Sequence, residues 1–116
     1  MFMDREIIPT THFSKIRDSL LKKRHLLQED YDEFVDELAK NPESGEVIPG
    51  TGGVRKIRLK SASKGKRGGF RVFYFYFQIK ARVYLFHILS KNEQDNITDD
   101  EKKMLRNFAH HFKRGS

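Results

Sequence analysis

The chain has 116 residues, of which 37% are hydrophobic, and it carries ten Phe, four Tyr, no Cys and a net charge of +7. This size suffices for one domain with a buried core, which we expect to cover residues 1–116. The absence of cysteine excludes disulfides and thiolate metal sites, and no run reaches the ~20 apolar residues that cross a bilayer. With no apolar run of signal-peptide length at the N-terminus, we predict a cytoplasmic protein without a membrane partner.

The N-terminal part of the sequence predicts a short strand and two helices. Residues 3–8 suit a strand that Pro9 closes. Apolar residues then recur three or four positions apart, which predicts amphipathic helices over residues 11–22 and 25–40. These positions are Phe13, Ile16 and Leu20 in the first helix, and Leu27, Tyr31, Phe34, Val35 and Leu38 in the second. The second helix should end at Asn41, because the residue before a proline is disfavoured in the α conformation.

The C-terminal part predicts three strands and a last helix. Residues 56–60 alternate between basic and apolar, whereas residues 70–77 and 83–89 are apolar on both faces, as in strands covered on both sides. Thr98 and Glu101 fit a capping box that begins the helix. The expected order is β-α-α-β-β-β-α. We predict an α+β fold, an antiparallel sheet with the helices packed on one face.

The positive charge is concentrated in the segment 55–71, which contains eight basic residues and no acid. They are Arg55, Lys56, Arg58, Lys60, Lys64, Lys66, Arg67 and Arg71. Elsewhere 15 basic residues nearly balance 16 acidic ones. A block of one sign repels itself, so it indicates an anionic partner, most often nucleic acid.

Several other motifs do not support a specific site. Gly65-Lys66 is followed by Arg67 and then by a strand, so neither a Walker motif nor a dinucleotide fingerprint is present, and the glycines are typical of turns. The histidines (His12, His25, His87, His110 and His111) lack metal-ligand spacing. His87 lies in an apolar strand and is expected in the core or at a site rim. We predict neither a metal nor another cofactor.

Lys56, Arg58 and Lys60 share one face of their strand, and Arg71 on the next strand is placed to reach the same surface. One interpretation is a solvated edge that binds phosphate non-specifically. The other is an RNA-cleaving site, in which arginines hold the phosphate and a lysine crowded by cations acts as a base. Residue pattern alone leaves both interpretations open.

The order of several motifs resembles a known toxin family. These motifs are NPESGEVIPGTGG at 41–53, RKIR at 55–58, GKRGGFR at 65–71 and KNE at 91–93. Together they resemble the RelE/ParE superfamily, and more closely the HigB-type, RelE-like toxins of type II toxin–antitoxin modules. The resemblance spans roughly residues 34–105 and agrees with the element order expected above.

The resemblance implies a ribosome-dependent endoribonuclease, an mRNA interferase that cuts mRNA in the ribosomal A site by 2′-hydroxyl attack without a metal, and so inhibits translation. It implies catalytic roles for Lys56, Arg58, Arg71 and Lys91, with Lys56 as base or charge stabiliser and the arginines on the phosphate. RNA backbone would be held by Arg55, Lys60, Lys64, Lys66 and Arg67. The implied partners are the 70S ribosome, mRNA, rRNA and a cognate antitoxin with a helix-turn-helix domain, the free toxin being a monomer.

The chain also departs from the best-known relatives. Asn92 stands where they carry an arginine after the lysine, and residues 95–98 lack their tyrosine. The C-terminal histidine of some HigB toxins is missing from the obvious place, unless His87, His110 or His111 substitutes for it. The resemblance therefore assigns neither the general base nor the general acid. Two alternative functions stay open, a ParE-like toxin that acts on gyrase and a non-catalytic nucleic-acid-binding module.

Overall fold

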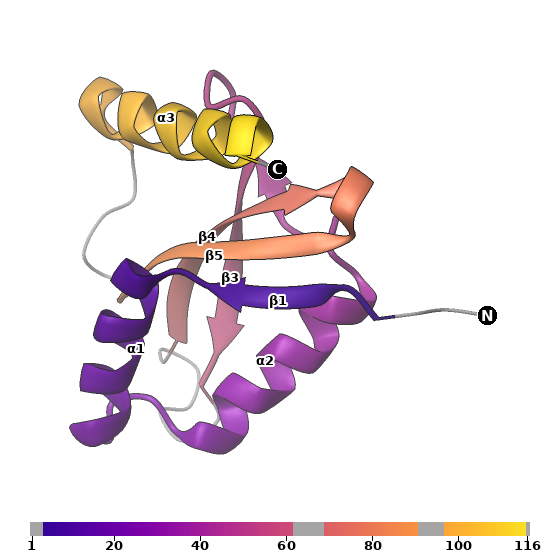
Figure 1. Ribbon diagram of the computed structural model, residues 1–116. Helices are drawn as coiled ribbons and strands as arrows, with labels where there is room; N and C mark the ends of the chain where they lie inside the picture. Colours follow the sequence, from indigo (N-terminus) through magenta and orange to yellow (C-terminus); the bar gives the residue numbers. More distant parts are fainter. Residues whose placement is uncertain (1–3, 62–68, 91–96, 116) are drawn as a thin grey trace.

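The computed structural model describes residues 4–61, 69–90 and 97–115, and within them a five-stranded sheet carries three α-helices (Figure 1). The elements are β1 (Glu6–Pro9), α1 (Thr11–Lys22), α2 (Gln28–Lys40), β2 (Glu46–Val47), β3 (Val54–Lys60), β4 (Gly69–Phe77), a 3-10 helix η2 (Gln78–Lys80), β5 (Arg82–Ser90) and α3 (Asp99–Gly115). None of the helices in these ranges is long and apolar enough to cross a membrane.

The sheet has the strand order β1-β5-β4-β3-β2. Strands β3, β4 and β5 form the expected antiparallel meander, with Arg58 opposite Arg71 and Phe73 opposite His87. Strand β1 runs parallel to β5 at one edge, and the two residues of β2 pair with β3 at the other. The predicted α+β class is therefore confirmed, and β4 is the central strand.

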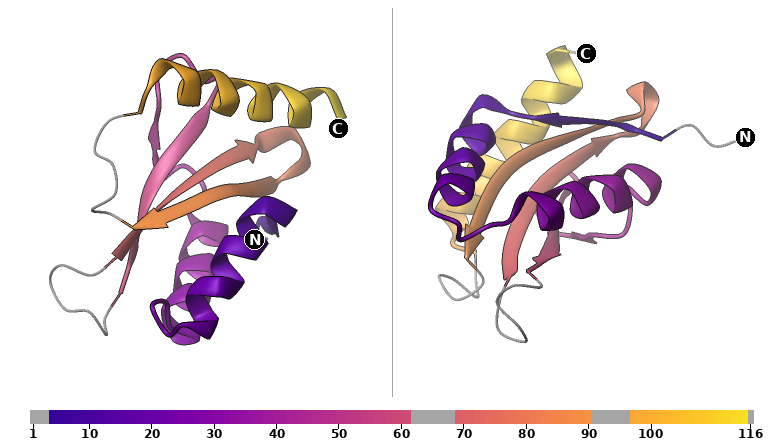
Figure 2. Two further views of the ribbon diagram at one scale, coloured as in Figure 1. Left: turned by 90° about the vertical axis from the view of Figure 1, so that its left-hand side faces the viewer. Right: turned by 90° about the horizontal axis from the view of Figure 1, so that it is seen from below.

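Each face of the sheet has its own apolar core. One core packs α1 and α2 against alternate residues of the strands, such as Leu59, Val72 and Leu85. The second packs α3 through Leu105, Phe108 and Ala109 against the other residues of the same strands, such as Phe73 and Phe75. Figure 2 shows the sheet between these helices, with α3 on the side away from α1 and α2.

The arrangement of the helices corrects one detail of the sequence prediction, which placed all of them on a single face. That placement holds for α1 and α2, whereas α3 covers the opposite face. The reason lies in β4, whose two faces are both apolar and both need cover from water. The predicted capping box does begin α3, because the Thr98 hydroxyl accepts from the Glu101 N–H at 3.2 Å and the Glu101 carboxylate accepts from the Thr98 N–H at 3.0 Å.

Most strand boundaries differ from the sequence prediction by one to three residues, while the start of α2 and the short strand β2 need a physical explanation. Helix α2 begins at Gln28 rather than near residue 25, because the N–H groups of His25 and Leu26 bond to the Leu20 carbonyl in the turn that closes α1. Arg24 in this turn takes a left-handed φ of 60°, which no helix continues. Strand β2 was not predicted, because two residues are too few to show a period.

A buried tyrosine fixes the loop between α2 and β3. The Tyr74 hydroxyl donates to the Pro42 carbonyl and accepts from the Gly45 N–H, both at 2.8 Å. A Cβ at Gly45 would lie only 2.5 Å from this hydroxyl, so the loop approaches as closely as glycine allows. Burial raises the pKa of Tyr74 above its ordinary value of 10.0. The loop position therefore depends on one neutral hydroxyl from the central strand.

We expect Tyr74→Phe to lower the free energy of unfolding by about 1–3 kcal/mol, because it leaves a buried N–H and a buried carbonyl without partners. Urea unfolding at pH 7 measures this loss. Tyr76→Phe is the matched control, because its hydroxyl accepts only a 3.4 Å bond from Arg5 in a partly buried position. An equal loss in both variants would contradict the role given to Tyr74.

The raised pKa of Tyr74 also predicts a pH dependence. Above pH 10 the unfolded chain loses this phenolic proton while the folded chain keeps it, so the unfolded state binds fewer protons. Stability from Tyr74 is therefore complete below pH 10 and falls as the pH rises further. We expect the stability difference between wild type and Tyr74→Phe to shrink above pH 10 in urea titrations, and a constant difference would contradict this linkage.

Candidate active site

Three basic residues of β3 lie on the α3 side of the sheet, beyond the part that α3 covers: Lys56, Arg58 and Lys60. Val54 begins this face of β3 and is fully buried in the α3 core. Lys56 is partly exposed, while Arg58 and Lys60 farther along the strand are exposed. In Figure 1, α3 crosses the sheet near the start of β3, and β3 then runs away from it. The sequence prediction of a cationic face on this strand is thus confirmed.

Strand β4 adds a second arginine to this face. Arg71 is the direct partner of Arg58 in the antiparallel register, and such partners have Cα atoms roughly 5 Å apart. Like charges placed directly opposite destabilise a sheet. A phosphate between two guanidinium groups reverses this repulsion, since each group offers paired N–H donors to its oxygens. Lys56 lies one step along β3, about 6.6 Å from Arg58, so three of the predicted residues gather on one surface.

Gly69 allows Arg58 to lie close to the backbone of the neighbouring strand. A Cβ at this glycine would stand 3.2 Å from Nε of Arg58 and 3.1 Å from the Leu59 carbonyl oxygen. Its φ of 144° is also one that other residues rarely adopt. The GKRGG motif thus ends in a glycine that the position of Arg58 requires.

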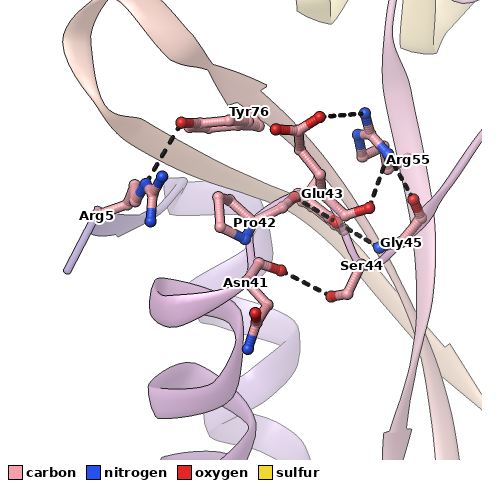
Figure 3. Close-up of polar contacts among 9 residues, drawn as sticks. Arg5, Asn41, Pro42, Glu43, Ser44, Gly45, Arg55 and Tyr76 are labelled. Atoms are coloured by element: carbon pink, nitrogen blue, oxygen red, sulfur yellow. Dashed lines mark hydrogen bonds and ion pairs between the residues drawn. The ribbon is translucent and has the colours of Figure 1, made fainter. Parts of the chain in front are cut away.

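Arg55 lies on the other face of the sheet, although it was grouped with the RNA-binding residues. Its guanidinium donates to the carbonyl oxygens of Glu43 and Gly45 at 3.1 and 2.7 Å, and its side chain is 20% exposed (Figure 3). Adjacent residues in a strand point to opposite faces, which separates Arg55 from Lys56. This geometry favours a role in holding the 43–45 loop.

Four predicted residues lie outside the described residues. They are Lys64, Lys66 and Arg67, which were expected to bind RNA, and Lys91, which was expected to be catalytic. Their roles stay predictions. Lys60 is exposed at the end of β3, opposite Gly69, and it continues the basic row beyond Arg58.

A β-bulge brings His87 to the basic face. The register passes from Phe73 opposite His87 to Tyr74 opposite Leu85, so Phe86 is the extra residue of β5. Without this bulge, His87 would follow Val83 and Leu85 into the α1–α2 core. With it, the imidazole lies 6.2 Å from the Phe73 ring, centroid to centroid, in the same cross-strand row as Lys56. Bulges that redirect a side chain are frequent beside active sites. The sequence showed no signal of this bulge.

A hollow of about 340 Å³ lies away from this face, near the start of β3 and the end of β4. The two cationic side chains that line this hollow, those of Arg55 and Lys113, bind backbone carbonyl oxygens. Arg55 binds the 43–45 loop, and Nζ of Lys113 donates to the Gly52 carbonyl at 2.8 Å while lying 5.5 Å from the Phe75 ring centroid. We therefore place the candidate active site on the basic face formed by Lys56, Arg58, Arg71 and His87.

The fold and this basic face define a small α+β protein with a cationic strand surface, and comparison with known proteins identifies its family. The family model described as the RelE toxin of the RelE/RelB toxin–antitoxin system matches residues 9–116, so the chain belongs to the RelE toxin family. The chain is also similar to the free-state structure of a mutant E. coli toxin RelE in which alanine replaces two arginines. The TM-score is 0.57 at 20% identity, over 78% of this chain and 86% of that one. This likeness supports the fold, and the family implies an antitoxin partner.

We expect Gly69→Ala to lower the free energy of unfolding by about 1–3 kcal/mol, because the backbone conformation is strained for alanine and the new methyl group displaces Arg58. Gly50→Ala is the matched control: this glycine also has a positive φ, of 81°, but a Cβ there meets nothing within 4 Å. Urea unfolding of the two variants compares these costs. If Gly50→Ala lowers the free energy of unfolding as much as Gly69→Ala does, the contact with Arg58 contributes nothing to the loss at Gly69.

Proposed function

We propose that this toxin is a ribosome-dependent endoribonuclease that cuts mRNA in the ribosomal A site. The observation that carries the proposal is the pair of opposed arginines, Arg58 and Arg71, beside Lys56 on an exposed part of the sheet. Opposed cations on the exposed strands of a RelE-family fold suit a polyanionic substrate. In the part of the chain that the structure describes, this face is an open strand surface, across which an RNA strand can lie.

The proposed reaction is attack of a 2′-hydroxyl on the adjacent phosphate. A bond forms between the 2′-oxygen and phosphorus, and the bond from phosphorus to the 5′-oxygen breaks. The products are a 2′,3′-cyclic phosphate and a 5′-hydroxyl, and no metal takes part. Negative charge grows on the phosphorane, and preorganised cations stabilise it. Arg58 and Arg71 hold the non-bridging oxygens in this scheme, and Lys56 offsets charge near the reacting oxygens.

Dependence on the ribosome is part of this proposal. The described part of the site supplies cations from the neighbouring strands β3 and β4. Alignment of the 2′-oxygen, phosphorus and 5′-oxygen accounts for a large share of the rate. We propose that the ribosome holds the mRNA in this alignment, and that Lys60, Lys64, Lys66, Arg67 and Lys91 contact mRNA or rRNA around the reacting phosphate.

The proposed partners are the 70S ribosome with its mRNA and a cognate antitoxin that carries a helix-turn-helix domain. We propose a monomeric toxin in the cytoplasm, where translating ribosomes are found. An antitoxin segment that presents acidic side chains to the basic face would both neutralise Arg58 and Arg71 and keep the toxin out of the ribosome.

Expression from a tightly repressed promoter, followed by mapping of mRNA 5′ ends, tests this function. We expect new 5′-hydroxyl ends at a fixed codon phase within translated frames. Arg71→Ala should remove them, because loss of one oxyanion-stabilising donor costs about 10²–10³-fold in rate. Arg106→Ala, which removes an exposed arginine on α3, is the control and should cut like wild type.

Growth arrest without new 5′ ends would overturn the proposal. A DNA supercoiling assay would then test a gyrase-directed toxin. Salt-dependent RNA binding without any cleaved product would instead indicate a non-catalytic binding module. If free mRNA is cleaved as fast as ribosome-bound mRNA, the protein is a nuclease that does not depend on the ribosome.

A further inference from the structure

Two histidines from distant parts of the sequence meet beside the basic face. Nε2 of His12, in the first turn of α1, lies 2.9 Å from Nδ1 of His87 on β5. Their rings are nearly parallel, with an interplanar angle of 16° and centroids 5.1 Å apart. At this distance one imidazole donates an N–H to the lone pair of the other. Resting on the proposed function, we infer that His87 is the general base for the 2′-hydroxyl and that His12 positions it.

The surrounding structure holds this pair in place. The Thr10 N–H bonds to the Leu85 carbonyl at 3.0 Å, which ties the start of α1 to β5 two residues before His87. The Thr10 hydroxyl also accepts from the Phe13 N–H and so caps α1. On the other side, the His12 ring contacts Phe86, the extra residue of the bulge, at 5.6 Å. Two different elements therefore set the orientation of the two imidazoles.

The pair is also close enough to the basic face to act on its substrate. Lys56, Phe73 and His87 are successive partners across β3, β4 and β5, and neighbouring strands lie about 4.8 Å apart. Arg71 is two residues from Phe73 on the same face. A phosphate held by Arg58 and Arg71 thus has Lys56 and His87 in the adjacent cross-strand row, on the two strands that flank Phe73. The described charged groups on these strands near His87 are all cations, which attract the phosphate.

The hydrogen bond between the histidines suits a base. When Nδ1–H of His87 donates to Nε2 of His12, Nε2 of His87 carries a lone pair. That nitrogen takes the 2′-hydroxyl proton as the 2′-oxygen bonds to phosphorus. His12 keeps accepting from Nδ1–H and stabilises the imidazolium that forms, as a carboxylate does in serine hydrolases. The departing 5′-oxygen takes its proton from the Lys56 ammonium, so the cleavage step balances without another reactant.

Single-turnover cleavage of mRNA on programmed 70S ribosomes tests the inference. We expect His87→Ala to slow cleavage about 100- to 1000-fold, within the range of general acid–base catalysis. Added imidazole should recover part of this rate, which a structural defect would not allow. His25→Gln is the matched control, because His25 is exposed in the turn between α1 and α2, and it should cut like wild type.

Variants of His12 test the positioning role. His12→Phe keeps an aromatic ring against Phe86 but removes the acceptor, so we expect cleavage about 10-fold slower. His12→Gln places an amide oxygen near the position of Nε2 and should cut faster than His12→Phe. Both variants should keep the urea midpoint of wild type. Equal rates for His12→Phe and His12→Gln would overturn the role of the hydrogen bond.

A substrate with sulfur in place of the departing 5′-oxygen separates base from acid, because a thiolate leaves without a proton. We expect the Lys56→Gln variant to cleave this sulfur-containing substrate at a restored rate, whereas cleavage by the His87→Ala variant should remain slow. Rescue of His87→Ala by sulfur would overturn its assignment as base. If wild type cuts and His87→Ala cuts equally fast, the inference alone fails. If wild type and Arg71→Ala both leave ribosomal mRNA intact, the proposed function fails and takes this inference with it.

Discussion

Strand β4 is apolar on both of its faces, and the rest of the structure follows from the need to cover them. Val72 and Tyr74 point into the core with α1 and α2, while Phe73 and Phe75 point into the core with α3. A strand with this pattern must lie between two neighbouring strands and between two layers of helices, because either exposed face would cost the free energy of hydrating large aromatic groups. The meander of β3, β4 and β5, the placement of α3 opposite the other helices, and the closely held 42–45 loop all satisfy this one constraint.

Arg71 is the exception to the apolar pattern of β4. It lies where α3 no longer covers this face of the sheet. Opposite it stands Arg58, and neither arginine contributes to the apolar cores. Local conflicts of this kind in an otherwise consistent fold are expected at functional sites. The stability of the scaffold comes from the two cores and from buried hydroxyls such as those of Tyr74 and Thr51. The register of β3 and β4 places the two arginines directly opposite each other.

The bulge at Phe86 links the scaffold to the chemistry proposed for the site. One extra residue in β5 reverses the direction of every side chain after it, which places Ile88 in the α1–α2 core and His87 on the basic face. The start of α1, tied to β5 through Thr10, supplies His12 at hydrogen-bonding distance. Two histidines that are 75 residues apart in the sequence thereby meet beside the basic face.

The elements that depend on local pattern could be predicted from the sequence. The amphipathic spacing of α1, the capping box of α3, the both-sided apolar runs of β4 and β5 and the basic row of β3 were predicted with boundaries that differ by a few residues. The sequence also indicated the family, since the glycine and arginine motifs occur in a fixed order. The face on which α3 packs and the meeting of His12 with His87 became known only from the tertiary structure. Both depend on contacts between residues far apart in the chain. A single extra residue in β5 also redirects His87 without leaving any periodic signal in the sequence.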